Sequence, residues 1–126
     1  MIYGVGTDIV EIARIKRVWS EYGTRFARRI LGPNELVRFE STKNPVRFLA
    51  LRFAAKEATS KALGTGFRRG VSPRLIEVVN NVAGKPDLQC HGAVAALFEE
   101  FRIAGSHVSL SDESEYAIAF VVLETA

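Results

Sequence analysis

Two carboxylates and a lysine have the types and spacing of a metal-phosphate site. Glu57 lies among alanines in the segment 47–66, which reads as one long helix, and a carboxylate in such close packing costs free energy unless a partner compensates it. Lys61 follows one turn later, and Arg47 lies on the same stripe of the helix. Asp8 follows a separate, strand-like run. Magnesium prefers oxygen ligands and keeps several waters, so these residues predict a magnesium-phosphate site.

The same residues also have a structural interpretation, which spacing alone leaves open. Asp8 can cap the helix that follows it. Glu57 and Lys61 can form an i+4 ion pair worth about 0.2–0.5 kcal/mol. In the functional interpretation Lys61 instead neutralises charge on a phosphate oxygen or a leaving group.

Other candidate groups are weaker. His107 heads a strand-like run in which Ser109 and Ser111 alternate on one face, so it is either a base or phosphate ligand or a structural residue. The segment 64–70, GTGFRRG, lacks the ending of a P-loop, so it is either a phosphate-binding loop or an ordinary end of a helix. Cys90 has no evident catalytic partners, and any attacking nucleophile is therefore expected to come from a substrate.

Positive charge is concentrated near the N-terminus. The formal net charge is +3, yet the segment 11–29 alone holds six basic residues against two acidic ones. An acidic partner protein, a nucleic acid or only solvent can face such a segment, and no RNP, GXXG or zinc-finger pattern supports nucleic acid. One hypothesis is therefore a non-catalytic module that binds an acidic protein or nucleic acid through residues 14–29.

Periodicity and turn residues predict an α+β fold in which an antiparallel sheet packs against a long central helix. The glycines at positions 4 and 6 indicate a close approach of another backbone or a ligand to the first strand. Strands are expected over 2–10, 75–79, 86–90, 107–110 and 116–123, and helices over 11–22, 24–31, 33–42, 45–63 and 92–104.

The length of 126 residues predicts one domain over 1–126. No apolar run approaches the roughly 18 residues of a membrane span, and the first residues do not resemble a signal peptide. A single cysteine excludes an internal disulfide. We therefore expect a cytoplasmic protein without a membrane partner.

Four segments together resemble a known family. They are GVGTDIVEIARI (4–15), RFAAKEATSKALGTG (52–66), NNVAGKP (80–86) and HVSLSDESEYAIAFVVLE (107–124). In this order they resemble the holo-(acyl-carrier-protein) synthases, the short class of 4'-phosphopantetheinyl transferases. Departures are small: Leu51 and Thr59 stand where many members have glycine and an aromatic residue, and Asp112 stands at a position that varies between histidine and aspartate.

The resemblance implies a 4'-phosphopantetheinyl transferase fold and a magnesium-dependent transfer of phosphopantetheine from coenzyme A to a serine of apo-acyl carrier protein, in support of fatty acid biosynthesis. Adenosine 3',5'-bisphosphate would be released. The family's homotrimers have active sites between subunits.

Carried over by motif, the resemblance also implies the roles of individual residues. Asp8 and Glu57 would bind magnesium, and Lys61 would contact the transferred phosphate. His107 would lie close to the coenzyme, and either His107 or Glu57 through water would be the base. The expected coenzyme-binding residues are Arg52, Gly64, Gly66, Lys85 and Pro86, and the expected carrier-binding residues are Arg14, Arg17, Arg25 and Arg28.

Overall fold

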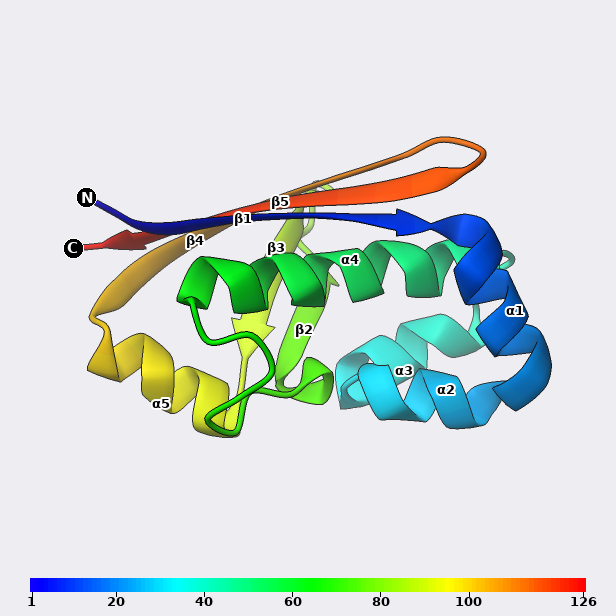
Figure 1. Cartoon of the computed structure of the whole chain (residues 1–126), viewed down its shortest axis with the longest axis horizontal. Coiled ribbons are helices and arrows are strands. Elements are labelled where there is room, and N and C mark those ends of the chain that lie inside the picture. Colours follow the sequence, from blue (N-terminus) through cyan, green and yellow to red (C-terminus); the bar gives the residue numbers. More distant parts are fainter.

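A long, almost completely buried helix, α4, organises the computed structural model, which describes residues 1–126 (Figure 1). Asn44 caps its N-terminus, because its side-chain oxygen accepts a hydrogen bond from the Arg47 backbone N–H at 3.1 Å. Gly64 ends it in the left-handed conformation at φ 82°. The elements are β1 (Ile2–Glu11), α1 (Ile12–Tyr22), α2 (Thr24–Ile30), α3 (Pro33–Glu40), α4 (Pro45–Leu63), η1 (Pro73–Leu75), β2 (Ile76–Asn80), β3 (Pro86–Cys90), α5 (Gly92–Glu100), β4 (Ile103–Asp112) and β5 (Tyr116–Thr125).

Three strands in the antiparallel order β1-β5-β4 form a sheet along one side of α4 (Figure 1). Its inner face buries Ala117, Ala119, Val121 and Leu123 of the central strand. The hairpin β2–β3 forms a second, two-stranded antiparallel sheet. The predicted α+β class and central helix are therefore confirmed, with two sheets in place of one.

The first strand lies unusually close to α4. A Cβ atom on Gly6 would be 1.8 Å from the carbonyl oxygen of Ala58, and one on Gly4 would be 2.0 Å from that of Ala62. Only glycine leaves room for this contact between a strand and a helix backbone. The expected close approach at these two glycines is confirmed, and the neighbour is α4.

The predicted helix over 92–104 is too long. The structure ends α5 at Glu100, and Arg102 adopts a left-handed φ of 58° before β4 begins at Ile103. Ile103 pairs with Thr125 of β5, so long-range strand pairing overrides the local helical pattern here.

A buried ionic cluster joins α3, α4 and β2. Glu35, Lys56 and Glu77 are all fully buried, and Lys56 Nζ lies 2.6 Å from Glu35 Oε1. Lys56 also donates to the carbonyl oxygens of Pro73 and Ile76. Burial lowers the pKa of Lys56, and the Glu35 charge opposes that effect.

The two carboxylates of this cluster accept further hydrogen bonds from backbone. Glu35 accepts from the N–H groups of Gly32 and Val78 at 2.9 and 3.0 Å, and Glu77 accepts from the Glu35 N–H at 2.9 Å. Removing one member of such a cluster leaves a buried charge without a partner, which typically costs 3–5 kcal/mol.

Helices α1 to α3 gather around the N-terminal half of α4, and α5 lies near its C-terminal end (Figure 1). None of the five helices combines the length and the apolar character that crossing a bilayer requires.

The substitution Gly6→Ala is expected to destabilise the protein by at least about 3 kcal/mol, because its methyl group would overlap the α4 backbone. Urea unfolding measures this loss. Gly105→Ala is the matched control, since a Cβ there meets nothing within 4 Å, and its effect should stay within about 1 kcal/mol. Equal stability of the two variants would contradict the close approach of β1 to α4.

Candidate active site

Asp8, Glu57 and Lys61 come together where β1 crosses the C-terminal half of α4. Lys61 Nζ donates to Asp8 Oδ1 and to the carbonyl oxygen of Thr7, each at 3.0 Å. The Asp8 side chain is 15% exposed, and Glu57 is half-buried. The strand is held here by the glycine contact described above, so its next inward-facing side chain necessarily meets this helix.

Neither structural interpretation of these residues is observed. Lys61 pairs with Asp8 across two elements instead of with Glu57 on its own helix. Asp8 does not cap α1, because Glu11 is the N-cap residue and no side chain bonds to the helix end. The Glu57 carboxylate has no hydrogen bond or ion pair with any other residue.

Electrostatics distinguish Glu57 from an ordinary surface glutamate. Burial raises its pKa first, the nearby charge of Asp8 raises it further, and Lys61 and Arg14 oppose both effects. Two neighbouring carboxylates, one without a protein partner, form a donor set that fits a hard divalent cation such as Mg²⁺. No third acidic residue, histidine or cysteine joins them. Water and substrate oxygens would complete the coordination of such an ion.

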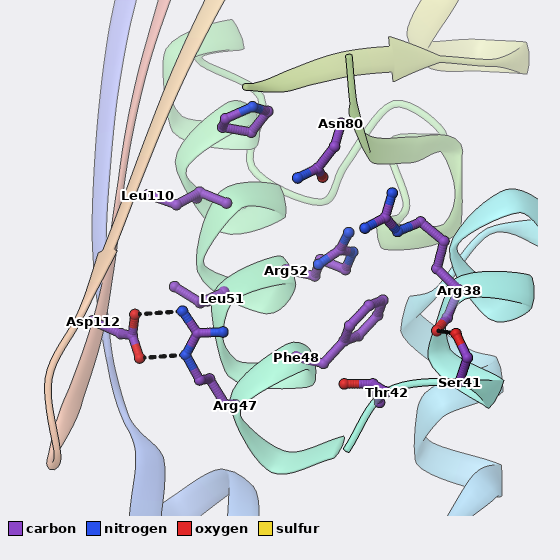
Figure 2. A pocket seen from close by; sticks show the side chains of 11 residues that line it. Arg38, Ser41, Thr42, Arg47, Phe48, Leu51, Arg52, Asn80, Leu110 and Asp112 are labelled. Carbon is purple, nitrogen blue, oxygen red and sulfur yellow. Dashed lines mark hydrogen bonds and ion pairs between the residues drawn. The ribbon is translucent and has the colours of Figure 1, made fainter. Parts of the chain in front are cut away.

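A separate, strongly basic cavity of about 550 Å³ lies beside the N-terminal half of α4 (Figure 2). Arg38, Arg47 and Arg52 line it together with Ser41, Thr42 and Asn80. Such a set of donors is suited to an anion.

Arg52 is the buried member of this set. It is only 7% exposed, and burial lowers its pKa to about 10, with Glu35 raising it and Arg38 lowering it. Its place in the cavity agrees with a coenzyme-binding role.

Sequence reasoning missed Arg38 and placed Arg47 with Glu57. Arg47 does not contact Glu57. Its guanidinium instead donates two hydrogen bonds, of 2.7 and 3.0 Å, to the carboxylate of Asp112 (Figure 2). Asp112 therefore contacts Arg47. The spacing of Phe48 and Arg52, at i and i+4, is a sequence signal that could have placed both on one wall of this cavity.

The remaining coenzyme candidates divide between two places. Lys85 and Pro86 line a neighbouring cavity of about 380 Å³ with His107, and Pro86 also lines the basic cavity. Gly64 and Gly66 line neither cavity; they follow α4 at its other end with φ values of 82° and 59°.

His107 does not meet the carboxylate pair within one chain. Asp8 pairs with Ala119, whose side chain is buried on the α4 side of the sheet. His107 pairs with Val122, which neighbours the buried Val121 and so points to the opposite face. There His107 Nε2 lies 2.8 Å from Glu124 Oε1.

The four arginines expected to bind a carrier protein are all exposed, two on α1 and two on α2. Arg17 has only a long ion pair with Glu11, at 3.8 Å. Arg25 borders a cavity of about 480 Å³ that Val18, Tyr22 and Phe26 also line. Arg14 acts on the pKa of Glu57, so Arg14 lies near the carboxylate pair. The other member of the set is Arg28.

Comparison with known proteins identifies the class. The chain belongs to the 4'-phosphopantetheinyl transferase superfamily, whose profile matches residues 4–121. A relative from Halorhodospira halophila named holo-[acyl-carrier-protein] synthase is 53% identical over 125 residues, 99% of each chain.

Solved structures agree with this class. The holo-[acyl-carrier-protein] synthase of Neisseria meningitidis is similar with a TM-score of 0.95 and 47% identity, over 99% of this chain and 100% of that one. A holo-(acyl-carrier-protein) synthase from Bacillus anthracis, in complex with CoA (3',5'-ADP), has a TM-score of 0.84 and 40% identity, over 100% and 99%. The transferase fold expected from the sequence is confirmed.

Glu57→Gln is expected to raise the melting temperature at pH 7 by a few degrees in metal-free buffer. Folding raises the pKa of Glu57 above its ordinary value of 4.5, so the folded protein takes up the proton more readily than the unfolded chain, and the ionised carboxylate costs stability at neutral pH. The gain should disappear below about pH 4.5, where the carboxyl is protonated in both states.

Thermal scans across pH measure this effect. Glu21→Gln, a change at an exposed glutamate of α1, is the control and should leave the melting temperature unchanged. A Glu57→Gln protein that melts below the wild type at pH 7 would show that the carboxylate is stabilised by partners, against the geometry described.

Proposed function

We propose that the protein transfers the 4'-phosphopantetheine group of coenzyme A to a serine of apo-acyl carrier protein and so supports fatty acid biosynthesis. One observation carries the proposal: relatives named holo-[acyl-carrier-protein] synthase match nearly the whole chain at about half identity. The similarity favours an enzyme over a non-catalytic binding module. The cytoplasmic location stays a prediction.

The reaction exchanges one phosphorus–oxygen bond for another. The carrier serine oxygen attacks the phosphorus atom that bears the pantetheine, the bond to the adenosine-side phosphate breaks, and adenosine 3',5'-bisphosphate leaves with that electron pair. The serine proton passes to a base. No nucleophile of this chain is needed, which agrees with the lack of a catalytic serine or cysteine arrangement in the sequence.

Asp8 and Glu57 are the residues that would hold Mg²⁺. Bound there, the ion would neutralise the diphosphate and orient it. Lys61, which already lies beside Asp8, would place its ammonium against the phosphate oxygens that gain charge as the bond breaks.

Two groups of the chain are candidates for the base. Glu57 has a raised pKa and no protein partner, which favours it as a proton acceptor through water. His107 is the alternative. Because it lies on the other face of its own sheet, it would have to reach the carboxylate pair of a neighbouring subunit.

We further propose that Arg52, Lys85 and Pro86 bind the coenzyme together with Gly64 and Gly66. The first three line two adjoining cavities that contain basic side chains. The Bacillus anthracis relative is described in complex with CoA (3',5'-ADP), which supports a coenzyme site on this fold.

A homotrimer with active sites between subunits is also proposed. The outer face of the three-stranded sheet is apolar and uncovered: Val5, Ile9, Ile118 and Phe120 are each 41–61% exposed. Apolar patches of this kind mark interaction sites, and a second copy of the chain can cover them symmetrically. The same face bears His107, so association would carry it to another subunit's site.

Sedimentation is expected to show a trimer for the wild type and a monomer for Phe120→Asp, since the new charge would be buried in the interface. The variant should also lose activity. A wild-type monomer with full activity would contradict the shared site.

The transfer itself is tested by mixing the protein with apo-carrier, coenzyme A and magnesium and measuring the mass gain of phosphopantetheine. We expect the gain with the wild type and at least about a hundredfold slower transfer with Asp8→Asn. Magnesium should raise the melting temperature of the wild type but not of Asp8→Asn.

Glu99→Gln on the exposed surface of α5 is the control and should transfer at the wild-type rate. An unmodified carrier under every divalent metal would refute the transferase. Full activity of Asp8→Asn would refute only the metal assignment.

Reversal of Arg25 and Arg28 to glutamate is expected to raise the KM for the carrier about tenfold at low salt, because these exposed arginines would steer an acidic partner. Both lie on α2, away from Glu57, so the KM for coenzyme A should not change. The difference should shrink at 0.5 M salt. Arg102→Glu, between α5 and β4, is the control. An unchanged carrier KM in the double variant would exclude this surface.

A further inference from the structure

The Arg52 guanidinium is held by groups that leave most of its hydrogen-bonding capacity unused. Its Nη2 donates to the Val78 carbonyl oxygen at 3.5 Å, the outer limit of a hydrogen bond. Its Nε is buried, makes no hydrogen bond and lies 3.5 Å from Glu35 Oε2. A guanidinium has five N–H donors, and those that have no partner within the chain are available to a ligand in the cavity that Arg52 lines.

The carboxylate behind Arg52 is already satisfied by other donors. Glu35 Oε1 receives Lys56 Nζ at 2.6 Å, and Oε2 receives the Val78 N–H at 3.0 Å. Lys56 Nζ, at 2.6 Å, is the nearer cation to Glu35, and Arg52 Nε lies 3.5 Å from the same carboxylate. Arg38 adds a second guanidinium to the cavity that Arg52 lines, so an anion there would meet both.

An aromatic ring lies directly against this guanidinium. Arg52 Cζ lies 3.7 Å from the centroid of the Phe48 ring, four residues earlier on the same face of α4 (Figure 2). Phe39 packs edge-on against Phe48 with centroids 5.5 Å apart, and Trp19 packs likewise against Phe39 at 5.5 Å. The contact with Phe39 of α3 thus restricts the side-chain conformations open to Phe48.

We propose that Phe48 is a positioning residue for phosphate binding: its ring holds the Arg52 guanidinium in the plane in which the donors left free by Glu35 face the basic cavity. The anion is a phosphate group of the coenzyme. That identity rests on the proposed function, whereas the stacking geometry and the cavity do not.

The test is a double-mutant cycle read by calorimetry without carrier protein. Phe48→Leu keeps an apolar side chain and removes the aromatic face, and it is expected to weaken coenzyme A binding about three- to tenfold. Phe48→Tyr keeps the face and should restore wild-type affinity. In an Arg52→Gln background Phe48→Leu should have no further effect, because its role acts through Arg52.

Dephospho-coenzyme A, which lacks the 3'-phosphate, is the second probe. If Arg52 receives that phosphate, Phe48→Leu weakens coenzyme A only; if Arg52 receives the diphosphate, it weakens both probes equally. Either pattern supports the proposal. In turnover, the KM for coenzyme A should rise while kcat stays at the wild-type value, a split that a general loss of structure would not give.

Phe98→Leu, at a half-buried phenylalanine of α5, is the matched control for loss of an aromatic core residue and should leave affinity unchanged. If Phe48→Leu does not fold, Phe48→Met replaces it. Wild-type affinity in the folded variant, an equal loss in the Arg52→Gln background or no rescue by tyrosine would overturn the proposal. Failure of phosphopantetheine transfer by the wild type would instead overturn the proposed function and leave the calorimetric result standing.

Discussion

The contact between the first strand and the backbone of α4 is the constraint on which the candidate site depends. Gly4 and Gly6 let β1 lie against the carbonyl groups of Ala62 and Ala58, where any side chain would overlap them. Two residues further along, Asp8 therefore reaches Lys61 and the surroundings of Glu57. A carboxylate pair with a raised pKa on Glu57 follows from this packing, and the proposed magnesium site depends on it.

The basic cavity depends on a different interaction, the buried ion cluster. Glu35 and Lys56 tie α3 to α4, while Glu77 and the β2 backbone accept or donate the remaining hydrogen bonds. Buried ion pairs seldom add net stability. Separating the two partners would leave a buried charge unpaired, so the elements that carry them are held in place. Here that geometry sets Arg52 at the cavity wall. The carboxylate pair thus depends on the glycine contact and the basic cavity on the ion cluster, at different positions along α4.

Local signals predicted the elements well, and long-range contacts account for what they missed. The Asn44 cap, the Gly64 end and the two close-approach glycines were all readable from residue type. The extension of β4 back to Ile103 was not, because it depends on pairing with Thr125. The burial of Lys56 was not predictable from local signals either, since its partner Glu35 lies 21 residues earlier. Arg47 was misplaced for the same reason: its partner Asp112 is 65 residues away.

Side chains of β5 alternate between the two faces of the sheet, so this one strand contributes to both the core and the outer surface. Ala119 and Val121 pack on α4, whereas Ile118 and Phe120 form the outer apolar face. A single-residue insertion or deletion within this strand would exchange the inward and outward side chains beyond it, so core and outer surface would be disrupted together. Length changes near β5 should therefore be tolerated in the turn at 113–115 and excluded from the strand itself.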